Sequence, residues 1–103
     1  LMAYEFVYDE RLGIRLPRLQ YEWERYSRET QARILFEWEA IRGTIPDRIK
    51  ELEKRINEKQ ERLQQEEDFA VSCQLNHEIS ELASVINDLW IWFRMRQTLK
   101  NKT

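Results

Sequence analysis

Cys73 and His77 are the residues of this chain whose types and spacing come nearest to a metal site. They stand at positions i and i+4, so on a helix both side chains lie over the same patch of surface. A structural zinc site takes four such ligands, and a catalytic site takes three and a water. The chain holds one Cys and one His, so only a symmetric dimer completes the set; the alternative is a polar helix face. We predict no metal and no other cofactor.

The acidic residues do not form a catalytic pair. Acid–base catalysis needs two carboxyl groups held apart in a cleft with shifted pKa values, whereas the acids here alternate with Arg and Lys. The run Glu66-Glu67-Asp68 is explained by a turn that ends in a helix cap. The sequence also has no Gly-rich phosphate loop and no Ser-His-Asp set. We predict that the protein is not an enzyme.

The segment 90–96 combines aromatic and basic side chains, and Lys100 and Lys102 follow it. Trp and Arg suit the surface of an anionic membrane, and aromatic rings stack on nucleic-acid bases. The other interpretation is a buried C-terminal helix whose last turns carry cations that complement the helix dipole. We favour burial and keep binding to a membrane surface or to nucleic acid as the alternative function.

Arginine and tryptophan are distributed as in a protein interface. Residues 1–49 contain eight Arg and no Lys, and interfaces favour Arg, Trp and Tyr over Lys because the planar guanidinium pairs and stacks. The alternative for the first helix is a core face with ordinary Arg–Glu flanks. The predicted interface residues are Trp23, Tyr26, Arg33, Trp38, Trp90, Trp92, Phe93 and Arg96.

The N-terminal members of this set must be positioned by an N-terminal arm and a long helix. Residues 1–16 are predicted as an arm, either extended or folded as a β-hairpin, because aromatic and other residues alternate there. A helix is predicted over residues 17–43. Pro17 suits its first turn, and Gly43 suits the position just past its end.

Two further helices are predicted over residues 45–65 and 69–100, with Thr44 and Asp68 as their caps. Apolar residues recur in both at steps of three or four, the spacing of one helix face. When the two helices are placed antiparallel, the apolar residues of one face those of the other. The opposed pairs are Ile49 with Ile86, Leu52 with Leu82, Ile56 with Ile79 and Leu63 with Ser72.

Residues 49–82 resemble the UVR motif, the small helical hairpin of bacterial excision-repair nuclease subunits and some stress-protease adaptors. The positions that match its second helix are Phe69, Leu75, Glu78, Ile79 and Leu82, and those that resemble its first helix are Ile49, Leu52, Glu53, Ile56 and Leu63. The connection from Leu63 to Phe69 is longer than in the family pattern. The resemblance implies a protein-docking hairpin that often self-associates.

Composition and charge limit the classes of function. With 103 residues the chain is predicted to form one domain, 1–103. A net charge of −2 leaves no electrostatic footprint for nucleic acid, so no nucleic acid is expected as a partner. No apolar run approaches the ~20 residues of a membrane span. The single Cys agrees with the reducing cytoplasm, where we expect the protein.

These observations predict an all-α fold in which a long N-terminal helix packs on an antiparallel helical hairpin. They predict a non-enzymatic protein–protein interaction module of unknown pathway. We expect a homodimer, and an unidentified protein is the other possible partner.

Overall fold

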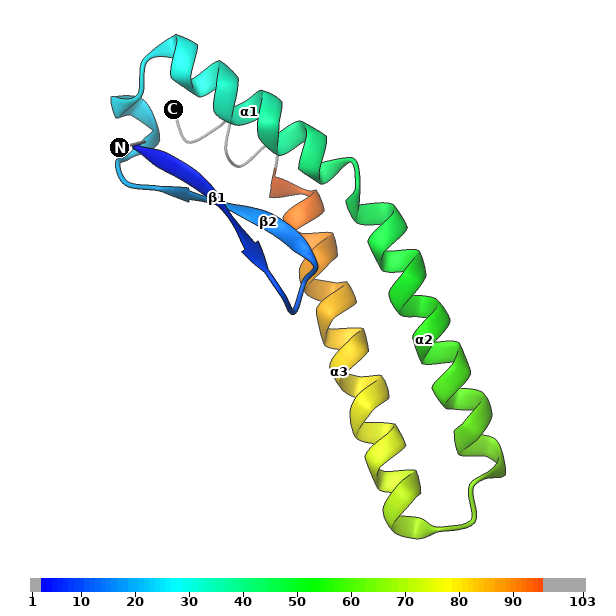
Figure 1. Ribbon diagram of the computed structural model, residues 1–103. Coiled ribbons are helices and arrows are strands. Elements are labelled where there is room, and N and C mark those ends of the chain that lie inside the picture. Colours follow the sequence, from blue (N-terminus) through cyan, green and yellow to red (C-terminus); the bar gives the residue numbers. More distant parts are fainter. Residues whose placement is uncertain (1–2, 96–103) are drawn as a thin grey trace.

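The described part of the molecule consists of a two-stranded sheet, a short 3₁₀ helix and three α-helices. The computed structural model describes residues 3–95. In chain order the elements are β1 Tyr4–Asp9, β2 Ile14–Leu19, the 3₁₀ helix Trp23–Arg25, α1 Arg28–Arg42, α2 Ile45–Gln65 and α3 Phe69–Phe93. In Figure 1, α1 and α2 follow one another along the molecule, and α3 returns beside α2.

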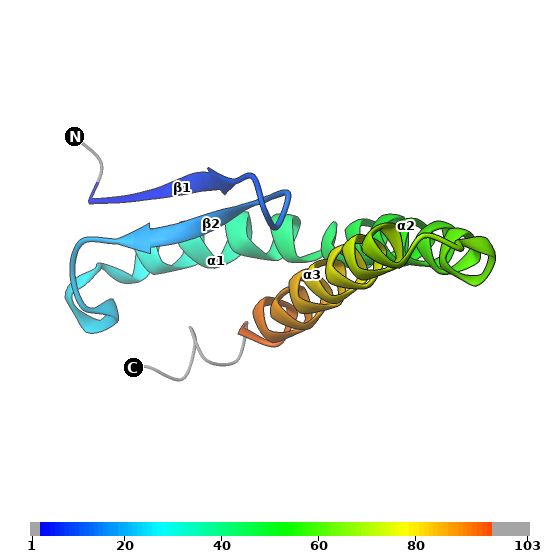
Figure 2. The ribbon, with the colours of Figure 1, turned by 90° about the horizontal axis from the view of Figure 1, so that it is seen from below.

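The molecule is elongated, with extents of 60 × 21 × 21 Å. Figure 2 shows the sheet lying along α1, while α2 and α3 extend away from the sheet as an antiparallel arm. The fold is therefore mostly helical, but it is not purely all-α, because the N-terminal arm is a small antiparallel sheet.

The N-terminal arm has the paired form of the two that the sequence left open. β1 and β2 pair antiparallel, from Tyr4 opposite Leu19 to Asp9 opposite Ile14. Gly13 closes the turn at a φ of 77°, a conformation that other residues adopt only with strain. Its N–H donates to the Asp9 carbonyl at 2.7 Å. Of the two forms left open, the structure has the β-hairpin, and β2 runs past residue 16 to Leu19.

The first helix is shorter than predicted. α1 begins at Arg28 rather than at Pro17, because the strand pairing continues through Pro17 to the end of β2. A two-stranded sheet has only edge strands, where Pro is tolerated. Ser27 caps α1 by accepting a hydrogen bond from the Thr30 N–H at 3.1 Å. The prediction of a helix over 17–43 is therefore wrong at its start.

Helices α2 and α3 have the boundaries predicted from the sequence, as far as the described residues extend. α2 spans residues 45–65 and α3 begins at residue 69, the ranges predicted from the sequence. Asp68 caps α3, since its carboxylate accepts from the backbone N–H groups of the next turn at 2.9 and 3.2 Å. α3 ends at Phe93, and the predicted continuation over 96–100 lies outside the described residues.

Thr44 does not cap α2 as predicted. Its own backbone is already helical, so its side chain is not placed to accept from the first N–H groups of α2. The hydroxyl donates instead to the Ile41 carbonyl at 2.7 Å, and the Thr44 N–H donates to the same carbonyl at 2.9 Å. Thr44 thus closes the end of α1.

One ion pair joins α2 to α3, since Lys59 Nζ lies 2.8 Å from Glu78 Oε1. The buried residues of α3 are Leu75, Val85 and Leu89. Leu75 and Leu89 follow the three- and four-residue spacing expected for this helix, whereas Val85 lies beside that spacing.

Buried side chains form two adjoining clusters. The larger cluster joins the turn of the sheet to all three helices and consists of Leu12, Ile14, Trp38, Ile41, Ile45, Ile49, Leu52, Val85 and Leu89. The smaller consists of Tyr4, Trp23, Tyr26 and Ile34. In the outer half of the described arm, Leu75 is the buried residue, while Ile56 and Ile79 stay partly exposed.

Candidate protein-interaction surface

Three of the predicted interface residues belong to the core. Trp23, Tyr26 and Trp38 are all buried, Trp38 completely, and the Trp38 ring packs edge-on against Trp92 with 5.7 Å between ring centroids. The alternative of a core face therefore holds for these three residues. Trp23 and Tyr26 precede α1 rather than lying on it.

The two arginines predicted for the interface, Arg33 and Arg96, add little to the described surface. Arg33 lies on the exposed side of α1 and pairs with Glu29 at 2.8 Å. An exposed ion pair one helical turn apart adds only a few tenths of a kcal/mol. Arg96 lies outside the described residues. Phe36, which the sequence analysis did not single out, is strongly exposed on the same helix.

The C-terminal end of α3 is held against α1 and keeps part of its aromatic surface free. Trp90 and Phe93 pack edge to face, with 5.5 Å between ring centroids, and Trp90 is 39% exposed. The Arg42 guanidinium lies 4.5 Å from the centre of the Phe93 ring and donates to the Phe93 carbonyl at 3.0 Å. A hydrogen bond to Glu39 raises the pKa of Arg42.

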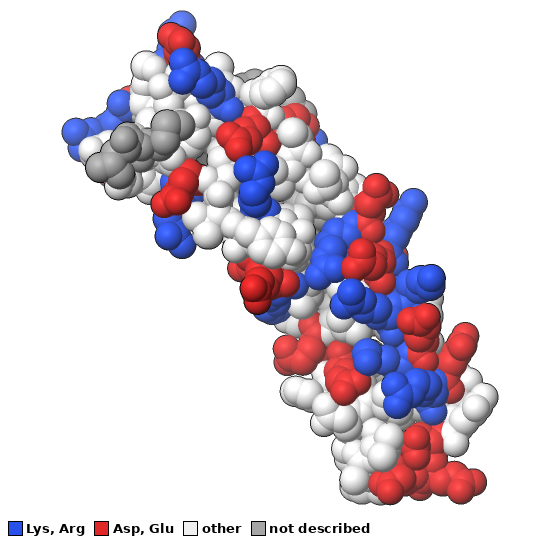
Figure 3. All heavy atoms as spheres, in the orientation of Figure 1, with Lys and Arg blue, Asp and Glu red and all other residues white. Residues whose placement is uncertain are grey.

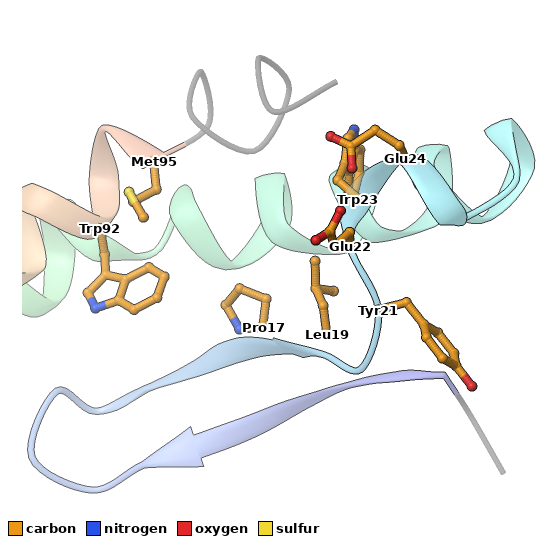
Figure 4. A pocket seen from close by; sticks show the side chains of 8 residues that line it. All are labelled: Pro17, Leu19, Tyr21, Glu22, Trp23, Glu24, Trp92 and Met95. Carbon is orange, nitrogen blue, oxygen red and sulfur yellow. The ribbon is translucent and has the colours of Figure 1, made fainter.

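A hollow of about 500 Å³ opens between β2, the segment after it and the end of α3. Its lining consists of Pro17, Leu19, Tyr21, Glu22, Trp23, Glu24, Trp92 and Met95. Figure 4 shows that Trp92 and Met95 reach it from the α3 end, whereas Pro17 and Leu19 reach it from β2. The carboxylates of Glu22 and Glu24 share this lining with apolar and aromatic side chains.

The α2–α3 arm has a charged side. A hollow on this side is lined by Arg55, Lys59, His77, Glu78, Glu81 and Leu82. The hydrogen bond from Lys59, with a second from Gln74 at 2.9 Å, lowers the pKa of Glu78. Figure 3 shows side chains of both signs interleaved over the arm on the face that it displays.

The turn of the sheet is attached to the arm through charged and polar contacts. Arg11 donates to Asp88 at 2.8 Å and to Ser84 at 3.0 Å. Arg48, from α2, donates to the Leu12 carbonyl at 2.9 Å. The N-terminal sheet and the arm are thereby fixed to each other at the base of the arm.

A second hollow between α2 and α3 is nearly uncharged. Its lining consists of Glu53, Ile56, Asn57, Gln60, Ala83 and Ile86, with a volume of about 560 Å³. Ile56 and Ile86 are partly exposed there, and Glu53 is the only ionisable group of the lining. Residues 69–93 contain no Lys and no Arg, and their acids Glu78, Glu81 and Asp88 make contacts or line a hollow elsewhere on the helix.

Cys73 and His77 lie one helical turn apart on α3, as expected from their spacing. Cys73 is exposed, and His77 belongs to the charged hollow. Among residues 3–95, no group of three or more His, Cys, Asp or Glu is placed to hold a metal ion. Within the same range, no helix combines the length and the apolar character needed to cross a membrane.

No protein-family model, curated protein or solved structure matches this chain significantly.

Proposed function

We propose that the protein is a non-enzymatic interaction module that self-associates through its α2–α3 arm. The observation that supports this most is the partly exposed apolar seam of the arm, which runs from Ile56 and Ile79 to Trp90. Two helices alone cannot cover both sides of their shared seam, so a further helical surface is needed to bury it.

The resemblance of residues 49–82 to the UVR motif supports the same proposal. That motif is a helical hairpin that docks on proteins, and α2 and α3 form an antiparallel pair over the corresponding residues. The lone exposed thiol of Cys73 fits a reducing compartment, so we propose the cytoplasm as the place where the module works.

Light scattering coupled to size-exclusion chromatography tests self-association. We expect the mass to approach twice the 12.7 kDa of one chain as concentration rises, since a specific apolar interface obeys mass action. A mass that stays at one chain throughout contradicts the proposal.

Binding measurements at low salt separate the alternative function. The purified chain is mixed with anionic vesicles of phosphatidylserine and phosphatidylcholine, and separately with single-stranded oligonucleotides. We expect no binding to either. Binding to one of them by a chain of monomeric mass would support the membrane or nucleic-acid alternative instead.

A further inference from the structure

We infer that the uncharged side of the arm pairs with the same side of a second copy, with the two α3 helices antiparallel and Ala83 at the two-fold axis. This inference rests on the proposed self-association and adds the face and the register. The residues that form the seam on α3 are Asn76, Ile79, Ala83, Ile86, Trp90 and Phe93.

The spacing of these residues is that of a helix–helix interface. They alternate steps of three and four residues along α3, which keeps one stripe facing a neighbouring helix. Asn76, Ala83 and Trp90 are exposed in the single chain, and Ile79 and Ile86 are partly exposed. The stripe is therefore available without any rearrangement of the core.

Charge distribution selects this side of the arm rather than the opposite one. The acids of α3 are Glu78, Glu81 and Asp88, and the first two line the charged hollow while Asp88 binds Arg11. The opposite side is thus both charged and, at its base, attached to the sheet. Charged residues are depleted at the core of protein interfaces, so the nearly uncharged side is the one suited to burial.

The side-chain sizes along the seam identify the occupant as a second copy. In an antiparallel pairing centred on Ala83, Asn76 of one copy lies opposite Trp90 of the other, and Ile79 lies within one residue of the level of Ile86. Ser72 likewise lies within one residue of the level of Phe93, so the smaller residues of one end receive the aromatic rings of the other. Facing surfaces pack best when large side chains meet small ones. The seam is therefore self-complementary when the two α3 helices run antiparallel.

A parallel pairing lacks that match. It would set Trp90 against its own counterpart and Phe93 against its own, while Ser72 and Asn76 would each face their own counterpart across a gap. It would also align the two helix dipoles, whereas an antiparallel pair opposes them. The antiparallel arrangement is therefore favoured by packing and by electrostatics.

The available area approaches that of a specific dimer. α3 has 25 residues, about 37 Å at 1.5 Å per residue. Two helices lying side by side, each about 10 Å wide, give a face of roughly 700 Å² per copy. A standard specific interface buries about 800 Å² per partner, so the arm alone comes close to that size.

Disulfide trapping tests the register. In a Cys73→Ser background, Ala83→Cys should give a covalent dimer under mild oxidation, because the two thiols meet at the axis. The matched variant Asn76→Cys lies on the same stripe, but in the antiparallel register its two copies stand about 20 Å apart, beyond the reach of a disulfide. It should stay uncrosslinked. Efficient crosslinking at Asn76 would overturn the antiparallel register.

Light scattering on the same variants separates failure of this inference from failure of the proposed function. A dimeric mass without a disulfide at Ala83 overturns the proposed face but leaves self-association standing. A monomeric mass overturns both.

A charge placed at the axis gives a second test. Ala83→Glu sets two carboxylates against each other and should weaken the dimer at least about 100-fold. Circular dichroism should be unchanged, since Ala83 is exposed in the single chain. The control Ser80→Glu adds the same charge on an exposed position off the stripe and should leave the mass dimeric. Native-like dimerisation of Ala83→Glu overturns the inference.

Discussion

At the scale of single residues, Tyr26 does more than fill the smaller core cluster. Its hydroxyl donates to the Ala3 carbonyl at 2.6 Å and accepts from the backbone N–H groups of Gln20 and Tyr21 at 3.0 and 3.2 Å. One side chain thus connects the start of β1 to the chain that leaves β2. A phenylalanine could fill the same volume but could not make these bonds.

Replacing Tyr26 by Phe should lower the free energy of unfolding by about 1 to 3 kcal/mol, because part-buried backbone groups lose their partner. Chemical denaturation measures the difference. Tyr8→Phe serves as the control, since the Tyr8 side chain is mostly exposed and has no hydrogen bond within residues 3–95. Equal stabilities of the two variants would contradict the assigned role of the hydroxyl.

The Glu78 carboxylate gives a prediction on pH. Because hydrogen bonding to Lys59 lowers the pKa of Glu78 in the folded protein, the group stabilises the fold above about pH 4.3, the ordinary glutamate value. That contribution is lost as pH falls through the lowered pKa. Glu78→Gln should therefore melt below the native protein at pH 7, and the difference should vanish in acid.

Glu81→Gln is the matched control for this titration. Glu81 lines the same hollow and shows no ion pair within the described residues. At pH 7, Glu81→Gln should have nearly the same melting temperature as the native protein. If Glu78→Gln behaves in the same way, the ion pair contributes nothing to stability.

At the scale of elements, the two glycines have different roles. Gly13 holds the sheet turn at positive φ, and a Cβ there would lie 2.5 Å from Arg48 Nε, the group that binds the Leu12 carbonyl. Gly43 follows α1 in a helical conformation with a φ of −65°. A Cβ on Gly43 would make only ordinary contacts of 3.5 and 3.6 Å.

Alanine at the two positions should therefore change stability in opposite directions. Gly13→Ala should destabilise by about 1 to 2 kcal/mol from backbone strain alone, and by more if Arg48 is displaced. Gly43→Ala should stabilise by up to about 1 kcal/mol, since it reduces the freedom of the unfolded chain. Thermal melts of both variants decide this, and a stabilised Gly13→Ala would refute the turn geometry.

The elements that could be predicted were those marked by local chemistry. Asp68 indicates the start of α3, and the alternating aromatic residues indicate β1. The late start of α1 was missed because Pro17 suits a helix N-terminus as well as an edge strand. The true start of α1 also had a local signal in the sequence, because Ser27 followed by Thr30 can form a helix cap. The spacing of Trp23 and Tyr26, which continues that of the helix, obscured this cap.

The candidate surface was predictable only in part, because exposure depends on contacts between distant elements. Trp90 and Trp92 are neighbours of the same type, yet Trp92 packs on Trp38 while Trp90 stays partly free. Their difference is set by the position of α1 against the end of α3, which no local pattern contains. The absence of basic residues along α3, in contrast, is visible in the sequence.

At the scale of the whole molecule, a compact base and a protruding arm have different requirements. The base buries both clusters, whereas the arm leaves its seam half covered. The proposed dimer would supply the missing layer.

Stability should then depend on protein concentration. For a folded dimer, each tenfold rise in concentration adds about 1.4 kcal/mol, which should raise the melting temperature by roughly 3 to 5 °C. Differential scanning calorimetry at several concentrations measures this shift. Ala83→Glu is the control and should melt at one temperature throughout; a native chain that does likewise would contradict the dimer.

The contact between the sheet turn and α3 also bears on how the chain is made. Arg11 and Leu12 meet residues that follow about 75 positions later, at Asp88 and Leu89. During synthesis the β-hairpin is made before α3, which supplies part of its packing surface. Closing so long a loop is slow, and until then the cluster around Ile14 lacks Val85 and Leu89. We therefore expect the larger cluster to be completed only after α3 has left the ribosome.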